Sequence, residues 1–145
     1  MLRNIGRFTW GGLLLVAVVV TAADSGPAAG TPLPPLRAYA VTGEVQNQEV
    51  NFVERRQGRP TLYCFIPADR WSRPTARLLK ELDNRLGDLT DAALVVVWVT
   101  DDPASSKDYL PRVQQSLQFG RTALAVSEEG PGGPGEWGIN IEVDL

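Results

Sequence analysis

TLYCFIPADRWSRPTARLLKEL, residues 61–82, is typical of a strand, a polar turn and an amphipathic helix in direct succession. Residues 61–66 are β-branched, aromatic and apolar on both faces, the pattern of a strand covered on both sides, as in parallel sheets. Ser72 is a preferred helix N-cap residue, and Pro74 is tolerated in a first helical turn. The apolar residues that follow recur at helical spacing: Ala76, Leu79, Leu82 and Leu86. The stretch therefore predicts a strand–turn–helix unit, with Gly87 as the natural stop of the helix.

The segments downstream of this unit predict a second strand and a second helix. Ala92–Thr100 (AALVVVWVT) is another apolar run of the kind found in buried strands. Asp101 or Asp102 is expected to cap the next helix. The apolar stripe of that helix consists of Leu110, Val113 and Leu117. Because Pro111 lies inside the helix, we expect a kink or two short helices there.

Shorter segments complete the expected order of elements. Residues 36–45 predict a strand, and residues 49–56 predict either a second short strand or one helical turn. Residues 122–127 predict a short strand, and residues 139–145 the start of another. The order β, β, α, β, α, β, loop, β contains a βαβ unit with a right-handed crossover. We therefore expect the α/β class, with helices on both faces of a central, mostly parallel sheet.

Composition excludes several classes of function. The chain has 145 residues, 43% of them hydrophobic and 21% charged, as in one globular domain. A formal net charge of −3 without a basic stripe argues against nucleic acid as a partner. With no histidine and one cysteine, a single chain cannot assemble the usual zinc ligand sets, a Ser-His-Asp or Cys-His group, or an internal disulfide. No metal and no other cofactor is expected.

Residues 1–23, MLRNIGRFTWGGLLLVAVVVTAA, have the three-part pattern of a secretory signal peptide. Arg3 and Arg7 give a positive start, residues 13–20 form an unbroken apolar run, and small residues at 21–23 mark the cleavage region. We expect an exported protein, periplasmic or extracellular, that is anchored to the membrane only if this segment is retained.

The next segment, DSGPAAGTPLPP at residues 24–35, predicts a flexible or extended linker because it is rich in Pro, Gly and Ala. The folded domain is therefore expected over residues 36–145.

From residue 36 to residue 145, the order and spacing of several segments resemble the thioredoxin-like superfamily. The resemblance is to its exported thiol reductases and to its peroxiredoxin, or redoxin, branch. GRPTLYCFIPAD resembles the first central strand of the family, and SRPTARLLKELDNRLG the helix after its active-site turn. AALVVVWVTDD resembles the next strand, and WGIN the segment before the family's cis-proline. The resemblance implies a thioredoxin-like fold.

The chemistry of that family needs a cysteine at the start of the helix, where backbone N–H groups and the helix dipole stabilise a thiolate. Aligned with the reductases, Arg70 and Arg73 occupy the two cysteine positions; aligned with the peroxiredoxins, Pro74 occupies the peroxidatic position. Arginine stays protonated and is no nucleophile. Cys64 lies inside the strand, where apolar neighbours raise a thiol pKa and restrict access. It is therefore a weak catalytic candidate, and a small core residue is the simpler interpretation.

Family members continue after the WGIN segment with a strand, a hairpin partner and a terminal helix, whereas this sequence stops at Leu145. The resemblance implies that the absent strand would pair with residues 61–66. We therefore expect an incomplete domain, a truncated product with an open edge on that strand, unless a partner supplies the strand by β-augmentation.

Residues around the turn are the remaining binding candidates. Arg70, Arg73 and Arg77 recur at helical spacing and would bind an anion together with the helix N-terminus, although a solvated charged face is the simpler interpretation. Trp71 is a candidate anchor for a partner protein, and folding onto the core is the simpler interpretation.

Three aspartates, Asp69, Asp101 and Asp102, are expected near the carboxyl end of the sheet, where open α/β folds bind ligands. A calcium site needs more oxygen ligands in a tight loop, and helix capping explains Asp101 and Asp102. Trp98 is assigned to the core, and Trp137 is expected to pack beneath its glycine-rich loop.

The leading hypothesis is an exported thioredoxin-like domain without thiol-disulfide activity, with a binding or structural role. The first alternative is an oxidoreductase, a peroxidase or reductase, that uses Cys64. The second alternative is a non-functional remnant of a longer redoxin. Fold alone does not decide among them, because one scaffold hosts many functions.

Overall fold

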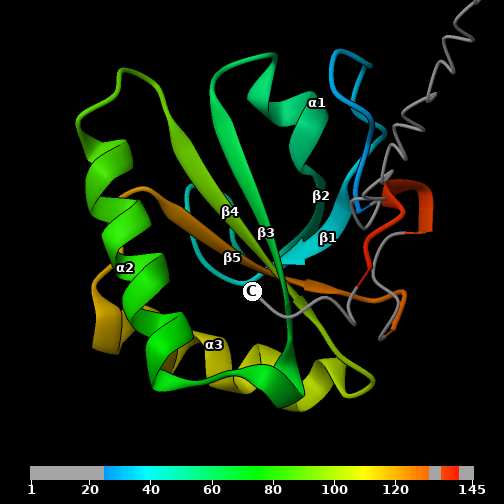
Figure 1. Cartoon of the computed structure of the whole chain (residues 1–145). Coiled ribbons are helices and arrows are strands. Elements are labelled where there is room, and N and C mark those ends of the chain that lie inside the picture. The colour runs from blue at the N-terminus through cyan, green and yellow to red at the C-terminus, as the bar shows by residue number, and fades with distance from the viewer. Residues whose placement is uncertain (1–24, 131–134, 141–145) are drawn as a thin grey trace, which may run out of the picture.

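Figure 1 shows the computed structural model of the chain, which describes residues 25–130 and 135–140. Its sheet has the strand order β2-β1-β5-β4-β3. The strands are β1 (Arg37–Ala40), β2 (Gln48–Asn51), β3 (Thr61–Pro67), β4 (Ala93–Val99) and β5 (Thr122–Ser127). The α-helices are α1 (Phe52–Arg56), α2 (Arg73–Gly87) and α3 (Pro103–Leu117). The chain is therefore of the mixed α/β kind that the sequence predicts.

The sheet has a parallel half and an antiparallel half. β3, β4 and β5 run parallel, and the register places Cys64 opposite Val96. β1 pairs antiparallel with both β5 and β2. Among the described residues β3 pairs only with β4, so β3 is an edge strand. The predicted signal peptide at residues 1–23 and the strand-like residues 141–145 lie outside the described ranges.

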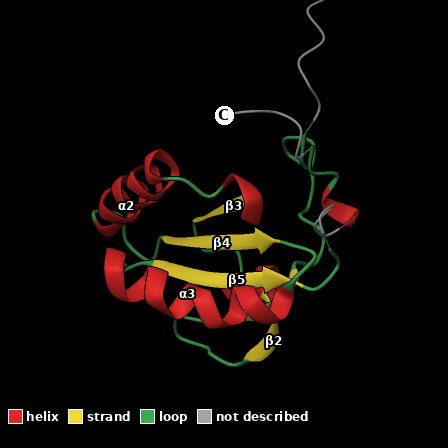
Figure 2. Ribbon diagram, turned by 90° about the horizontal axis from the view of Figure 1, so that it is seen from below, coloured by secondary structure: helices red, strands yellow, loops and turns green. Residues whose placement is uncertain are grey.

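The two long helices lie on the same face of the sheet (Figure 2), and among the described α-helices only the short α1 lies on the opposite face, so the expected cover of both faces is uneven. One core cluster contains Leu79 of α2 and Leu110 of α3, together with Val96 of β4. The strand order explains the arrangement. The chain moves from β3 to β4 to β5 in one direction, and two right-handed crossovers in one direction place both helices on one side.

The opposite face is covered by shorter pieces. Phe52 of α1 packs there with Leu36 and Val97. Trp137 is buried against Tyr63 and Phe65, with ring centroids 5.3 Å apart in each pair. Trp137 thus covers β3, and the prediction that it packs beneath its glycine-rich loop falls partly on residues 131–134, outside the described residues.

Local signals place the helix boundaries well. Ser72 caps α2, since its Oγ accepts the backbone N–H of Thr75, and Asp102 caps α3 in the same way through Ser105. The ambiguous segment at residues 49–56 contains both alternatives, the end of β2 followed by α1. α3 continues through Pro111 as one helix, so of the two alternatives the pair of short helices is wrong, and the kink stays a prediction. Proline removes one helical hydrogen bond, and buried side chains on either side hold the helix to the sheet: Leu110 and Val113.

The segment before β1 runs without helix or strand from residue 25 to residue 36. It contacts the far end of the chain, because the N–H of Gly26 donates to the carbonyl of Gly138 and the indole Nε1 of Trp137 donates to the carbonyl of Pro35. No helix within the described ranges is long and apolar enough to cross a bilayer.

Candidate functional site

The turn between β3 and α2 lies at the carboxyl end of the parallel strands, the edge where open α/β sheets bind ligands. A short 3₁₀ turn (Ala68–Arg70) leaves β3, and Trp71 and Ser72 lead into α2. The first two helical residues are Arg73 and Pro74. The first turn of α2 therefore offers a guanidinium and a pyrrolidine ring, and no thiol.

Cys64 lies in the middle of β3, away from this turn. Its side chain packs on the face that α2 and α3 cover, against the core cluster around Val96. Burial raises the pKa of the Cys64 thiol above its ordinary value. The thiol is therefore protonated at neutral pH, the opposite of what a nucleophilic cysteine requires.

Three aromatic side chains form the most distinctive feature at this edge. Trp71 packs on Trp98 with ring centroids 5.0 Å apart, and Trp98 packs on Tyr109 with centroids 6.1 Å apart. The indole Nε1 of Trp71 donates to the hydroxyl of Tyr109 at 3.2 Å, which closes the group into a triangle. The group joins the turn, the end of β4 and the first half of α3.

An open hollow of about 400 Å³ lies beside these rings. Its polar lining comes from the end of β4 and the start of α3: Thr100, Asp102, Ser105 and Ser106. Hydrogen bonds from the hydroxyl and the backbone N–H of Ser105 lower the pKa of the Asp102 carboxyl. The hollow thus combines aromatic rings with hydroxyls and one ionised carboxylate.

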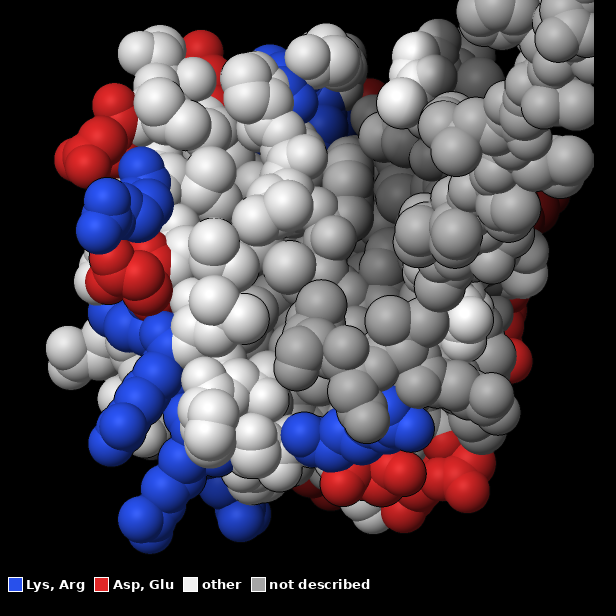
Figure 3. All heavy atoms as spheres, in the orientation of Figure 1, with Lys and Arg blue, Asp and Glu red and all other residues white. Residues whose placement is uncertain are grey.

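Trp71 folds onto the core, the simpler of its two interpretations, and its role as a partner anchor stays a prediction. Its ring packs against the core through Trp98, yet it stays half-buried and lines the hollow. Arg70, Arg73 and Arg77 are exposed, and the hollow's lining does not include them. In Figure 3 basic side chains gather over the beginning of α2, so this edge carries positive charge next to the aromatic group.

The predicted aspartates do not form a metal site. Asp69 and Asp101 are exposed, and Asp102 is the helix cap that the sequence suggested. The described part of the chain contains no group of three or more Asp, Glu, Cys or His side chains that could hold a metal ion.

Sequence reasoning missed Tyr109 and Asp83. Tyr109 is 41% exposed, and only its place one residue before the stripe position Leu110 hinted that it borders the sheet. Asp83 follows Leu79 by one helical turn, so a carboxylate on an apolar stripe was the available signal. The structure buries Asp83, where it accepts hydrogen bonds from two residues that precede β5 and from its first residue: Gly120, Arg121 and Thr122.

Comparison with known proteins supplies no relative. The chain matches no family model, no curated protein and no solved structure. The site must therefore be interpreted from its own residues.

Proposed function

We propose that this chain is an exported thioredoxin-like domain that binds a partner and performs no thiol–disulfide chemistry. The observation that carries the proposal is the set of groups at the start of α2, namely Ser72, Arg73 and Pro74. A reactive thiol belongs at this position because the helix terminus stabilises its anion. Ser72 instead satisfies the helix terminus itself, and the chain has no histidine to activate its hydroxyl.

The surroundings of the helix support the same proposal. β3 lies at an edge of the sheet, α2 follows it, and the antiparallel pair β1–β2 lies at the other edge. This arrangement is compatible with a thioredoxin-like scaffold in which a further strand would pair with β3. The thiol of Cys64 is part-buried and its pKa is raised, which favours a core role over a catalytic one.

The aromatic group is the proposed binding surface, and its proposed ligand is a polypeptide segment. Tryptophan, tyrosine and arginine are the residues most enriched in protein-binding hot spots. Trp71 and Tyr109 present ring surface at the hollow, and the exposed Arg73 and Arg77 lie along the adjoining helix. A segment that inserts an apolar side chain beside Trp71 and carries a neighbouring carboxylate would match this surface.

The absence of thiol chemistry is tested by insulin reduction and peroxide consumption, with Cys64→Ser as the matched control. We expect background rates for both proteins. Turnover in the wild type that disappears in Cys64→Ser would contradict the proposal and support an oxidoreductase that uses Cys64.

The binding role is tested by selecting peptides from a displayed random library against the full chain. We expect peptides whose affinity falls at least tenfold in Trp71→Ala and in Tyr109→Ala, the magnitude of a hot-spot loss. Leu89→Ala, an exposed apolar change near the opposite end of α2, is the control and should leave affinity unchanged. A selection that yields no peptide, or peptides insensitive to both aromatic changes, would argue against this surface.

A further inference from the structure

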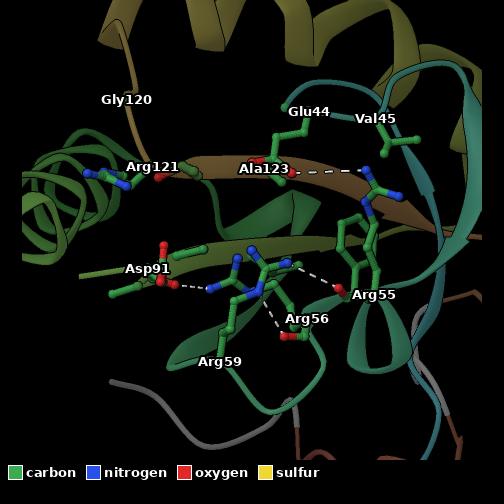
Figure 4. A pocket seen from close by; sticks show the side chains of 15 residues that line it. Glu44, Val45, Arg55, Arg56, Arg59, Asp91, Gly120, Arg121 and Ala123 are labelled. Carbon is green, nitrogen blue, oxygen red and sulfur yellow. Dashed lines mark hydrogen bonds and ion pairs between the residues drawn. The ribbon is translucent and has the colours of Figure 1, made fainter. Parts of the chain in front are cut away.

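A second pocket, of about 260 Å³, opens at the amino ends of β4 and β5, the end of the sheet opposite Trp71 (Figure 4). Its apolar lining comes from α1 and the strands: Phe52, Val95 and Ala123. The turn at residues 43–45 and the residues that precede β5, 120–121, complete its walls. Nothing in the proposed function uses this pocket.

The charged residues of this pocket are predominantly basic. Four arginines line it: Arg55, Arg56, Arg59 and Arg121. The acidic lining residues are Glu44 and Asp91, so the lining carries two more positive than negative side chains. The chain as a whole has a formal charge of −3. This concentration of arginine runs against the overall balance and produces a local positive potential.

The arginines differ in how much of their hydrogen-bonding capacity is already used. Arg56 is fixed, since it donates to the Thr61 hydroxyl at 2.7 Å, to the Pro60 carbonyl at 3.0 Å and to the Asp91 carbonyl. Arg59 donates to two carbonyls at the end of α1, those of Arg55 and Arg56, and a guanidinium has five N–H donors in all. Arg56 therefore positions the wall of the pocket, and Arg59 keeps donors for a ligand.

Arg55 is held only loosely. Its guanidinium lies 4.0 Å from the carboxylate of Glu44, and the two side chains are 48% and 80% exposed. Exposed pairs of this length contribute little to stability. In Figure 4 this pair spans the side of the pocket away from Arg56 and Arg59. An anion can therefore replace Glu44 as the partner of Arg55 at small cost.

We propose that this pocket binds a small organic anion, a phosphate or carboxylate group carried on an apolar body. Arg55 and Arg59 flank the pocket from two sides, and both attract the anionic group, because guanidinium forks match both phosphate and carboxylate oxygens. Phe52, Val95 and Ala123 contact the apolar body. The volume is slightly below the roughly 300–1,000 Å³ of sites for drug-sized ligands, which favours a small molecule.

The probe for this proposal is phenyl phosphate, titrated into the ¹⁵N-labelled full chain in low salt, with phenylacetate as the carboxylate counterpart. We expect saturable shifts of backbone amides at residues 43–45, 55–59 and 120–123 with one or both probes. Inorganic phosphate should bind at least fivefold more weakly, because it lacks the apolar body. Phenol should give no saturable shift, because it lacks the anionic group. Raising the salt to 0.3 M should weaken binding, since exposed charges are screened.

Variants distinguish specific binding in this pocket from non-specific attraction of an anion to positive charge. Arg55→Gln and Arg59→Gln should each weaken phenyl phosphate binding at least tenfold, whereas Arg112→Gln, an exposed change on α3, should leave it unchanged. Glu44→Gln should strengthen binding two- to fivefold, because it removes the competing carboxylate. Absence of saturable binding by both probes, equal losses in Arg55→Gln and Arg112→Gln, or shifts confined to residues 70–77 would overturn the proposal.

Discussion

The two ends of the parallel strands differ in the surface that lines their hollows. At the carboxyl end, Trp71, Trp98 and Tyr109 form an aromatic group beside an open hollow. At the amino end, arginines of α1 and its following turn surround a smaller pocket. The carboxyl end is where α/β proteins usually bind their ligands, and here it offers aromatic ring surface. The comparison teaches that the edge where α/β sheets usually bind ligands and the pocket with the most charged side chains can lie at opposite ends of the same strands.

At the amino end of the strands, Asp83 accepts more hydrogen bonds than any other described side chain. Its removal should cause the largest loss in the free energy of unfolding. Asp83→Ala leaves the N–H groups of Gly120 and Arg121 and the Thr122 hydroxyl without their acceptor, so we expect a loss of about 3 kcal/mol in the free energy of unfolding. Urea denaturation measures the loss. Asp88→Ala, an exposed carboxylate beyond the end of α2, should change stability by less than about 0.5 kcal/mol. Equal effects of the two changes would show that the Asp83 hydrogen bonds do not anchor the start of β5.

The carboxyl end should lose less when its aromatic group is broken. Trp71→Ala removes a half-buried ring and its hydrogen bond to Tyr109, so we expect a loss of about 2 kcal/mol, below the roughly 3–5 kcal/mol for a fully buried tryptophan. Trp71→Phe keeps the contact with Trp98 and should recover about half of the loss. A change below about 0.5 kcal/mol in Trp71→Ala would mean that the ring contributes no packing and is free for a ligand.

Acid should destabilise the protein at the amino end of the strands, because it protonates Asp83. Burial alone would raise the pKa of this carboxyl, but hydrogen bonds from Gly120, Thr122 and Arg121 together hold the pKa below its ordinary value. A lowered folded-state pKa adds stability that is fully present above about pH 5 and is lost as the pH falls below about 4. Asp83→Asn should flatten the fall in unfolding free energy between about pH 5 and pH 3, whereas Asp88→Asn should not. An unchanged slope in Asp83→Asn would contradict this account.

The smallest stability change is expected at the turn beside the arginine pocket. Gly43 has a φ of +114°, and an added Cβ would lie 3.0 Å from the Cβ of Ala123 on β5. Gly43→Ala should therefore cost about 1 kcal/mol, the scale of forcing a side chain into this conformation. Gly58→Ala meets no neighbouring atom although its φ is also positive, so thermal denaturation of the pair separates the contact from the backbone strain. Equal losses would assign the whole effect to backbone strain.

Sequence patterns predicted the local structure better than the arrangement of the layers. The caps Ser72 and Asp102 and the buried strand at residues 93–99 follow from residue types whose physical preferences are strong and local. The sequence left open whether Pro111 kinks the helix or divides it; α3 continues as one helix because packing of the flanking residues outweighs the lost hydrogen bond. The one-sided placement of α2 and α3 depends on the order of strands in the sheet, which no single segment encodes.

The candidate sites were predictable only in part. The turn containing Trp71 was found because a strand, a turn and a helix follow one another in the sequence. The arginine pocket was not found, because Arg55 and Arg59 meet Gly43–Val45 and Arg121 only when α1 lies over the amino ends of the strands. Asp83 gave a signal, a carboxylate on an apolar stripe, and its partners could not be identified before β5 was placed beside α2.

The buried indole of Trp137 joins two segments that are distant in sequence. It covers Tyr63 and Phe65, and its hydrogen bond ends at the Pro35 carbonyl of the segment before β1. Removal of the chain through residue 35 would delete the carbonyl that accepts from this indole, and we expect the aromatic side chains of β3 to become more exposed. Recombinant versions that begin at residue 36 should therefore aggregate more readily than those that begin at Ser25. Light scattering during storage would measure the difference.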